Sequence, residues 1–191
     1  MGSMITFQRP DGQSVQGHLA EAAGSSGGPA VVVIQEWWGL NDQIRGVADR
    51  LARAGYTALV PDLYRGQSTV EAEEAHHLMT GLDFGAAASQ DIRGAVQALK
   101  ARSAGKVGVT GFCMGGAMTI LASARVSEFT AGAPFYGLPP AAAAGPGDVL
   151  HARFRVPLLP EEPARLGDDQ FLLGCAVLSL RHGPLFRPRP P

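Results

Sequence analysis

Runs of hydrophobic residues separated by turn sequences predict the strands of this chain. Residues 5–8 and 14–21 flank Pro10-Asp11-Gly12, a pattern that predicts an opening antiparallel hairpin. Residues 31–34 are a continuous run of β-branched side chains, which is typical of a central strand buried on both faces. Further strands are predicted over residues 56–60, 106–110 and 129–136.

Hydrophobic residues at helical spacing lie between these strands. One predicted helix begins at Asn41-Asp42 and ends before Gly55, and its apolar stripe consists of Ile44, Val47, Ala48 and Leu51. Further helices are predicted over residues 69–82, 88–99 and 117–125. This alternation of strands and helices predicts an α/β fold, in which a mostly parallel central sheet carries helices on both faces.

The regular alternation is lost from about residue 139 onward. The chain ends in Arg187-Pro188-Arg189-Pro190-Pro191, which excludes a helix or an inner strand there. Residues 171–180 have the character of a buried element, which by periodicity is either a strand or a helix. We therefore expect a single domain over residues 1–191, with a regular core over 1–138, an atypical tail over 139–191, and a sheet that is incomplete at its C-terminal side.

The composition of the chain limits which binding partners and which cellular location we expect for the protein. A length of 191 residues with 46% hydrophobic content suits one domain with one sizeable core. The formal net charge of −1 argues against nucleic acid or an acidic membrane surface as a partner. No segment offers the roughly 20 apolar residues of a membrane span, and the first residues lack the apolar region of a signal peptide. The sequence thus predicts a cytoplasmic protein whose partner is a small neutral or anionic molecule.

The two cysteines, Cys113 and Cys175, are too few for a disulfide framework or a thiolate zinc site. They also form no Cys-x-x-Cys pair. We therefore predict neither a metal nor a cofactor for this chain.

The segment Gly111-Phe112-Cys113-Met114-Gly115 has the form Gly-x-nucleophile-x-Gly and lies between a predicted strand and a predicted helix. Glycines suit such a turn because neighbouring backbone comes too close for side chains. The turn exposes the Cys113 sulfur at the carboxyl edge of the sheet, and the following helix directs amides and partial positive charge toward it. A tight turn around an inert buried cysteine is the alternative. The setting favours a catalytic Cys113, with the Met114 amide as an oxyanion donor.

Three motifs follow successive predicted strands: Gln35-Glu36-Trp37-Trp38-Gly39-Leu40-Asn41, Pro61-Asp62-Leu63-Tyr64 and Gly111-Phe112-Cys113-Met114-Gly115-Gly116. Together they resemble the dienelactone hydrolases, also called carboxymethylenebutenolidases, over about residues 31–137. The resemblance implies an α/β-hydrolase-type fold. It also implies that the chain hydrolyses an ester or lactone of a small molecule by means of a cysteine nucleophile.

The resemblance further implies roles for residues near Cys113. Glu36 matches the glutamate that lies beside the nucleophile and holds the resting thiol until substrate arrives, and a solvated strand end is the alternative for this carboxylate. The amide of Trp37 matches the second oxyanion donor. Ala72 stands where founding members of the family have an arginine that holds the substrate carboxylate. We therefore expect an ester or lactone of a different shape from dienelactone.

Two pairs of adjacent residues, Trp37-Trp38 and His76-His77, also bear on the pocket. We expect one of Trp37 and Trp38 to pack in the core and the other to line the pocket. His76 and His77 are adjacent on a predicted helix and project about 100° apart, so they do not form a metal pair. One of the two histidines is a candidate to face the pocket.

A thiol hydrolase of this fold needs a histidine base oriented by a carboxylate, in the order Asp then His after the nucleophile. The candidates are Asp168 or Asp169, followed by His182. Positions 169 and 182 are only 13 residues apart, too close for a helix and a strand of about 10 and 5 residues between them. We hypothesise that a shifted reading frame or a truncated domain begins between Pro139 and His151, and natural divergence is the alternative.

The sequence therefore supports a primary hypothesis and two alternatives. In the first, Cys113 attacks an ester or lactone carbonyl, the Met114 and Trp37 amides bind the oxyanion, and a histidine base, His182 with Asp169, and water complete turnover, while Glu36 holds the resting thiol. In the second, the chain is a catalytically impaired remnant that binds small carbonyl compounds. In the third, Cys113 is a redox-sensing thiol, although no second cysteine is placed to resolve it. An incomplete sheet would expose an apolar edge, so the chain is expected to be a monomer or a homodimer.

Overall fold

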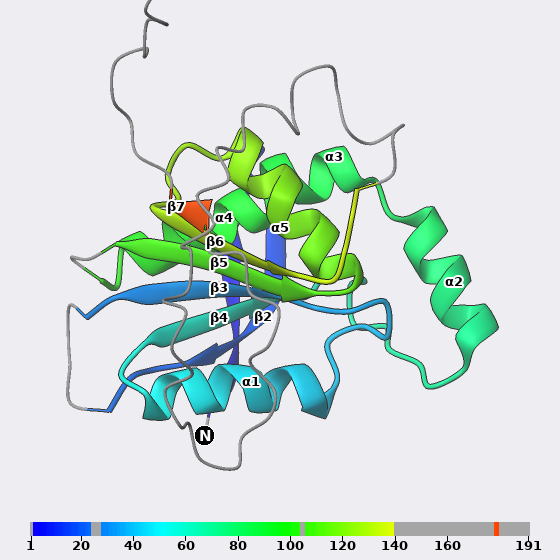
Figure 1. The fold of residues 1–191 in the computed structure, drawn as a ribbon. Coiled ribbons are helices and arrows are strands. Elements are labelled where there is room, and N and C mark those ends of the chain that lie inside the picture. Colours follow the sequence, from blue (N-terminus) through cyan, green and yellow to red (C-terminus); the bar gives the residue numbers. More distant parts are fainter. Residues whose placement is uncertain (1, 24–27, 104–105, 140–177, 180–191) are drawn as a thin grey trace, which may run out of the picture.

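The computed structural model describes residues 2–23, 28–103, 106–139 and 178–179, and a single sheet forms the centre of this part of the chain (Figure 1). Its strands are β1 (Ser3–Gln8), β2 (Ser14–Ala20), β3 (Ala30–Ile34), β4 (Thr57–Pro61), β5 (Val107–Phe112), β6 (Ala131–Phe135) and β7 (Leu178–Ser179). The strand order is β1-β2-β4-β3-β5-β6-β7.

The four central strands β4, β3, β5 and β6 run parallel to one another, and antiparallel pairs flank them. β1 and β2 form the predicted hairpin, and β2 pairs antiparallel with β4. At the other edge β7 pairs antiparallel with β6. The predicted α/β fold with a mostly parallel centre is confirmed, and residues 178–179 are a strand within the segment 171–180 for which strand and helix were both open.

Helices cover both faces of this sheet (Figure 1). They are α1 (Asp42–Arg53), α2 (Ala72–Gly81), α3 (Phe84–Ala86), the π-helical turn η1 (Ala87–Ile92), α4 (Arg93–Lys100) and α5 (Met114–Arg125). α1 packs on one face, whereas α4 and α5 pack on the other, and α2 projects at the side (Figure 1).

The two faces of β3 explain why the sheet holds two layers of helices. Val32 and Ile34 belong to a large core cluster that includes residues of α4 and α5, while Val33 belongs to a second cluster with Ile44 and Ala48 of α1. Side chains alternate between the faces of a strand, so an uninterrupted β-branched run supplies both clusters at once. These strand residues are fully buried.

Three of the predicted helices have different boundaries in the structure. The helix expected over residues 88–99 is part of a longer helical segment over residues 84–100, which is divided into α3, η1 and α4 because Ala87–Ile92 adopt a π-helical turn. The helix expected over residues 69–82 begins at Ala72. The helix expected from residue 117 begins three residues earlier, at Met114. Close packing of Gly115 and Gly116 against the sheet outweighs the poor helix propensity of glycine there.

Candidate active site

Cys113 occupies a sharp turn between β5, which ends at Phe112, and α5, which begins at Met114. Its backbone has φ 53° and ψ −116°, a left-handed conformation that is uncommon for a residue other than glycine. Strained backbone of this kind concentrates at functional sites. The residue is half-buried, so the turn presents its side chain at the carboxyl edge of the parallel strands rather than in the core.

Glycines surround this turn where two chain segments touch. A Cβ atom on Gly115 would lie 2.6 Å from the carbonyl oxygen of Gln35 and even closer to that of Ile34. A Cβ atom on Gly111 would meet the carbonyl group of Gly115. The absence of side chains therefore lets the start of α5 approach the end of β3, as the motif predicts.

Two backbone hydrogen bonds fix the turn to its neighbours. The Cys113 N–H donates to the carbonyl of Phe135 at 3.1 Å, and the Cys113 carbonyl accepts from Ala117 N–H at 3.1 Å. Gly137 lies directly against the same Cys113 carbonyl. The nucleophile candidate is thus held between α5 and the end of β6.

Met114 is the first residue of α5, and the amides of a helix's first turn have no acceptor within the helix. Its amide is therefore suited to an anion at the turn. The Met114 sulfur accepts a hydrogen bond of 3.1 Å from the hydroxyl of the buried Tyr64. Burial, and after it the proximity of Cys113, raises the pKa of Tyr64. Tyr64 belongs to one of the sequence motifs but had no predicted role, and in the structure it lies beside the Gly111–Gly115 turn, which we call the elbow.

The loop that carries Tyr64 is fixed by buried polar groups. The Asp62 carboxylate accepts from the Tyr64 N–H at 3.1 Å, and the fully buried Gln35 accepts from the Leu63 N–H at 3.2 Å through its Oε1. Gln35 directly follows β3, and Leu63 follows β4. These bonds tie two neighbouring strand ends together beneath the site.

Glu36 lies just beyond β3 and is half-buried. Its Oε1 accepts a hydrogen bond of 3.1 Å from the hydroxyl of Tyr136, which follows β6. Tyr136 was not singled out from the sequence, although its position directly after a strand beside the elbow is a signal that could have found it. The role predicted for Glu36 toward the thiol stays a prediction.

Trp37 and Trp38 lie in a turn in which the Gly39 N–H donates to the Glu36 carbonyl at 3.3 Å. Their rings meet edge to face with centroids 5.0 Å apart. Trp37 packs against the large core cluster, while both side chains remain half-buried. The predicted use of the Trp37 amide as an oxyanion donor stays a prediction.

The remaining candidates are exposed on α2 or lie outside the described residues. Ala72 begins α2, and it, His76 and His77 are exposed on that helix. Asp168, Asp169 and His182 lie outside the described residues, and their predicted part in a triad remains untested.

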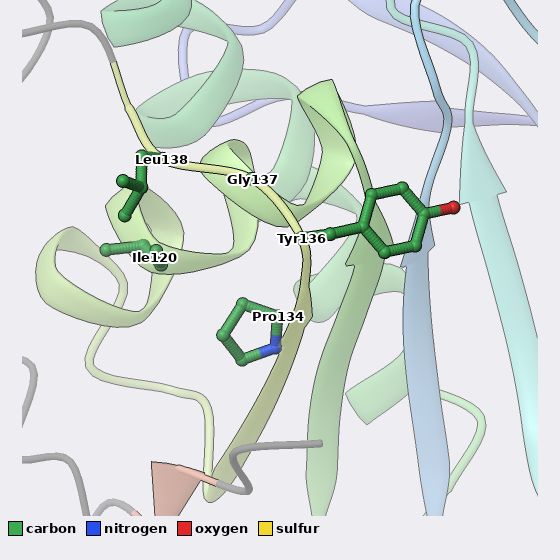
Figure 2. Close-up of a pocket in the computed structure, with 5 residues that line it drawn as sticks. All are labelled: Ile120, Pro134, Tyr136, Gly137 and Leu138. Atoms are coloured by element: carbon green, nitrogen blue, oxygen red, sulfur yellow. The ribbon is translucent and has the colours of Figure 1, made fainter. Parts of the chain in front are cut away.

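An open apolar hollow lies beside the site, with a volume of about 430 Å³ (Figure 2). α5 contributes Ile120, β6 contributes Pro134, and the segment after β6 contributes Tyr136, Gly137 and Leu138. Gly137 also touches the Cys113 backbone, so this hollow begins next to the elbow.

A parallel sheet with a strained nucleophile turn between a central strand and a buried helix defines the α/β-hydrolase class. The chain belongs to the dienelactone hydrolase family, whose profile matches residues 15–151. The match confirms the resemblance and extends beyond residues 31–137 at both ends. Among the described residues, none of the helices has the length and apolar character that crossing a membrane requires.

Curated relatives agree with this assignment. Protein usf of Aquifex pyrophilus is 37% identical over 148 residues, which are 73% of this chain and 63% of that protein. Carboxymethylenebutenolidase of Pseudomonas putida is 32% identical over 132 residues, which are 63% of this chain and 55% of the enzyme. The chain thus spans less than two thirds of the length of these relatives.

Solved structures support the fold. A protein structure from Klebsiella pneumoniae has a TM-score of 0.63 at 26% identity, over 72% of this chain and 60% of the other. A dienelactone hydrolase-like promiscuous phosphotriesterase from metagenomic libraries has a TM-score of 0.58 at 28% identity, over 77% of this chain and 63% of the other.

Proposed function

We propose that this chain hydrolyses an ester or lactone of a small molecule with the Cys113 thiolate as nucleophile. One observation carries the proposal: Cys113 has φ 53° in a glycine-packed turn at the start of α5. Strain of this kind is maintained because the surrounding structure fixes it, and it serves to present a nucleophile beside helix amides. The membership in a hydrolase family points in the same direction.

In the proposed reaction the Cys113 sulfur attacks the substrate carbonyl carbon and forms a new C–S bond. The carbonyl oxygen gains negative charge and is stabilised by the amides of Met114 and Trp37. The tetrahedral intermediate then expels the alcohol oxygen, which takes up a proton from the protonated histidine. A water molecule, deprotonated by a histidine base, attacks the thioester and releases the acid and the thiol. His182 and Asp169 are the proposed base and its partner.

The substrate class follows from the family and from one residue. The carboxymethylenebutenolidase relative supports a small ester or lactone. Ala72 offers no positive charge at the position proposed to hold a substrate carboxylate, so we favour a substrate without that group. Because the chain spans only part of its relatives' length, the activity of those whole proteins enters here as a proposal.

Hydrolysis of p-nitrophenyl acetate tests the proposal directly. We expect steady release of p-nitrophenol by the wild-type protein and a loss of at least about a hundredfold in Cys113→Ala, since covalent catalysis ends with the nucleophile. Equal rates in the two proteins would contradict the proposal. A burst of one equivalent without further turnover would instead indicate the impaired remnant, in which the thiol is acylated but no base completes the reaction.

A further inference from the structure

Tyr136 combines two features that packing alone does not require. Its backbone has φ 36°, in the left-handed region that a bulky residue rarely adopts. Its side chain is nevertheless 74% exposed, so core burial does not account for the conformation. A residue held in such a conformation at a site edge suggests a role for its side chain.

The elbow itself holds the backbone around Tyr136. On one side, the Phe135 carbonyl accepts from the Cys113 N–H, and on the other side, Gly137 lies against the Cys113 carbonyl. The Tyr136 ring lies 6.2 Å from the ring of Phe112, which directly precedes the cysteine. The position of Tyr136 is therefore fixed relative to Cys113.

The Tyr136 side chain extends away from the hollow lined by Ile120, Pro134 and Leu138, with its hydroxyl directed toward the neighbouring strands (Figure 2). There it donates a hydrogen bond of 3.1 Å to Oε1 of Glu36. Burial, then the charge and hydrogen bond of Glu36, and then Cys113 raise the pKa of Tyr136. Both the carboxylate and the thiol thus act on this one hydroxyl.

We propose that Tyr136 is a positioning residue whose hydroxyl occupies the Glu36 carboxylate and so keeps it from holding the Cys113 thiol. The inference rests on the proposed function of Cys113 and on the role toward the thiol that the family resemblance implies for Glu36. A carboxylate that accepts the thiol proton in a hydrogen bond stabilises the unreactive thiol, whereas a carboxylate already hydrogen-bonded to Tyr136 does so less. Tyr136 thereby favours the released, reactive form of the nucleophile.

Alkylation of Cys113 by iodoacetamide, followed by mass spectrometry of the Cys113 peptide, measures this effect without any hydrolysis step. Tyr136→Phe removes the hydroxyl and keeps the ring. We expect it to slow alkylation about fivefold, the factor that corresponds to one hydrogen bond. Tyr56→Phe is the matched control, because Tyr56 is also partly exposed but directly precedes β4 and so lies at the amino end of the parallel strands. Its alkylation rate should equal that of the wild type.

The same substitution in a Glu36→Ala background tests whether the tyrosine acts through the carboxylate. We expect Tyr136→Phe to have no effect on alkylation there. An unchanged or faster rate with Glu36 present, or an equal slowing without Glu36, would overturn the inference. Failure of the proposed function is separately visible, because Cys113→Ala would then retain ester hydrolysis whatever the alkylation rates.

Discussion

Helices α5 and α2 both follow motifs at the carboxyl edge of the sheet, but the fold holds them very differently. Ten of the twelve residues of α5 are buried, whereas Ala75 is the one buried residue among the ten of α2. α5 packs against β3, β5 and β6, while α2 projects from the side of the sheet (Figure 1). The helix that follows the proposed nucleophile is therefore built into the core, and the helix that carries the predicted substrate-binding position is peripheral.

Among substitutions that test this difference between the two helices, Gly115→Ala in α5 is expected to change the free energy of unfolding most. The new Cβ atom would lie 2.6 Å from the Gln35 carbonyl oxygen, where only backbone movement can relieve the clash. We expect a loss of about 3 kcal/mol in the free energy of unfolding, typical of an overpacked site. Urea denaturation measures it. A loss below about 0.5 kcal/mol would mean that α5 and β3 are less tightly joined than described.

A smaller effect is expected from Gln35→Met, which keeps the side-chain volume but removes the acceptor for the Leu63 N–H. That amide would be left buried without a partner, so we expect a loss of about 1 to 2 kcal/mol in unfolding free energy. The Gln35 Nε2 has no hydrogen-bond partner in the described structure, and its removal offsets part of the loss. Unchanged stability in urea denaturation would show that this link between strand ends is not needed.

The smallest effect is expected from Gly81→Ala at the end of α2. A Cβ atom there meets nothing within 4 Å, and the residue has no positive φ. Alanine is the better helix former, so we expect a gain of about 0.5 kcal/mol in unfolding free energy. This variant is the matched control for Gly115→Ala. A loss as large as that of Gly115→Ala would contradict the conclusion that α5 is packed in the core and α2 is peripheral.

The sequence predicted those features that depend on local pattern. The hairpin of β1 and β2, the doubly buried β3 and the strand-turn-helix around Cys113 each follow from spacing and glycine placement. The true start of α5 at Met114 did not follow, because Gly115 and Gly116 disfavour a helix until the close contact with β3 and β6 is known. Long-range packing overrides local preference at this point.

Contacts between distant segments were also beyond prediction. The bonds from Tyr136 to Glu36 and from Tyr64 to Met114 join residues 100 and 50 positions apart. The π-helical turn of η1 likewise holds Asp91, a buried carboxylate that pairs with Arg65 at 2.8 Å and Arg9 at 3.4 Å. Burial outweighs these two arginines and raises the pKa of Asp91. The hydrophobic periodicity of a single segment does not indicate which distant residue each of these side chains will contact.

The most direct test of the account is to identify the residue that becomes acylated. The protein is mixed with p-nitrophenyl acetate, quenched in acid, digested and analysed by mass spectrometry. The account predicts acetyl on the peptide that contains Cys113, and no acetyl on the corresponding peptide of Cys113→Ala. Acetylation elsewhere with Cys113 unmodified, in a protein that still hydrolyses the ester, would contradict a nucleophilic elbow at this position.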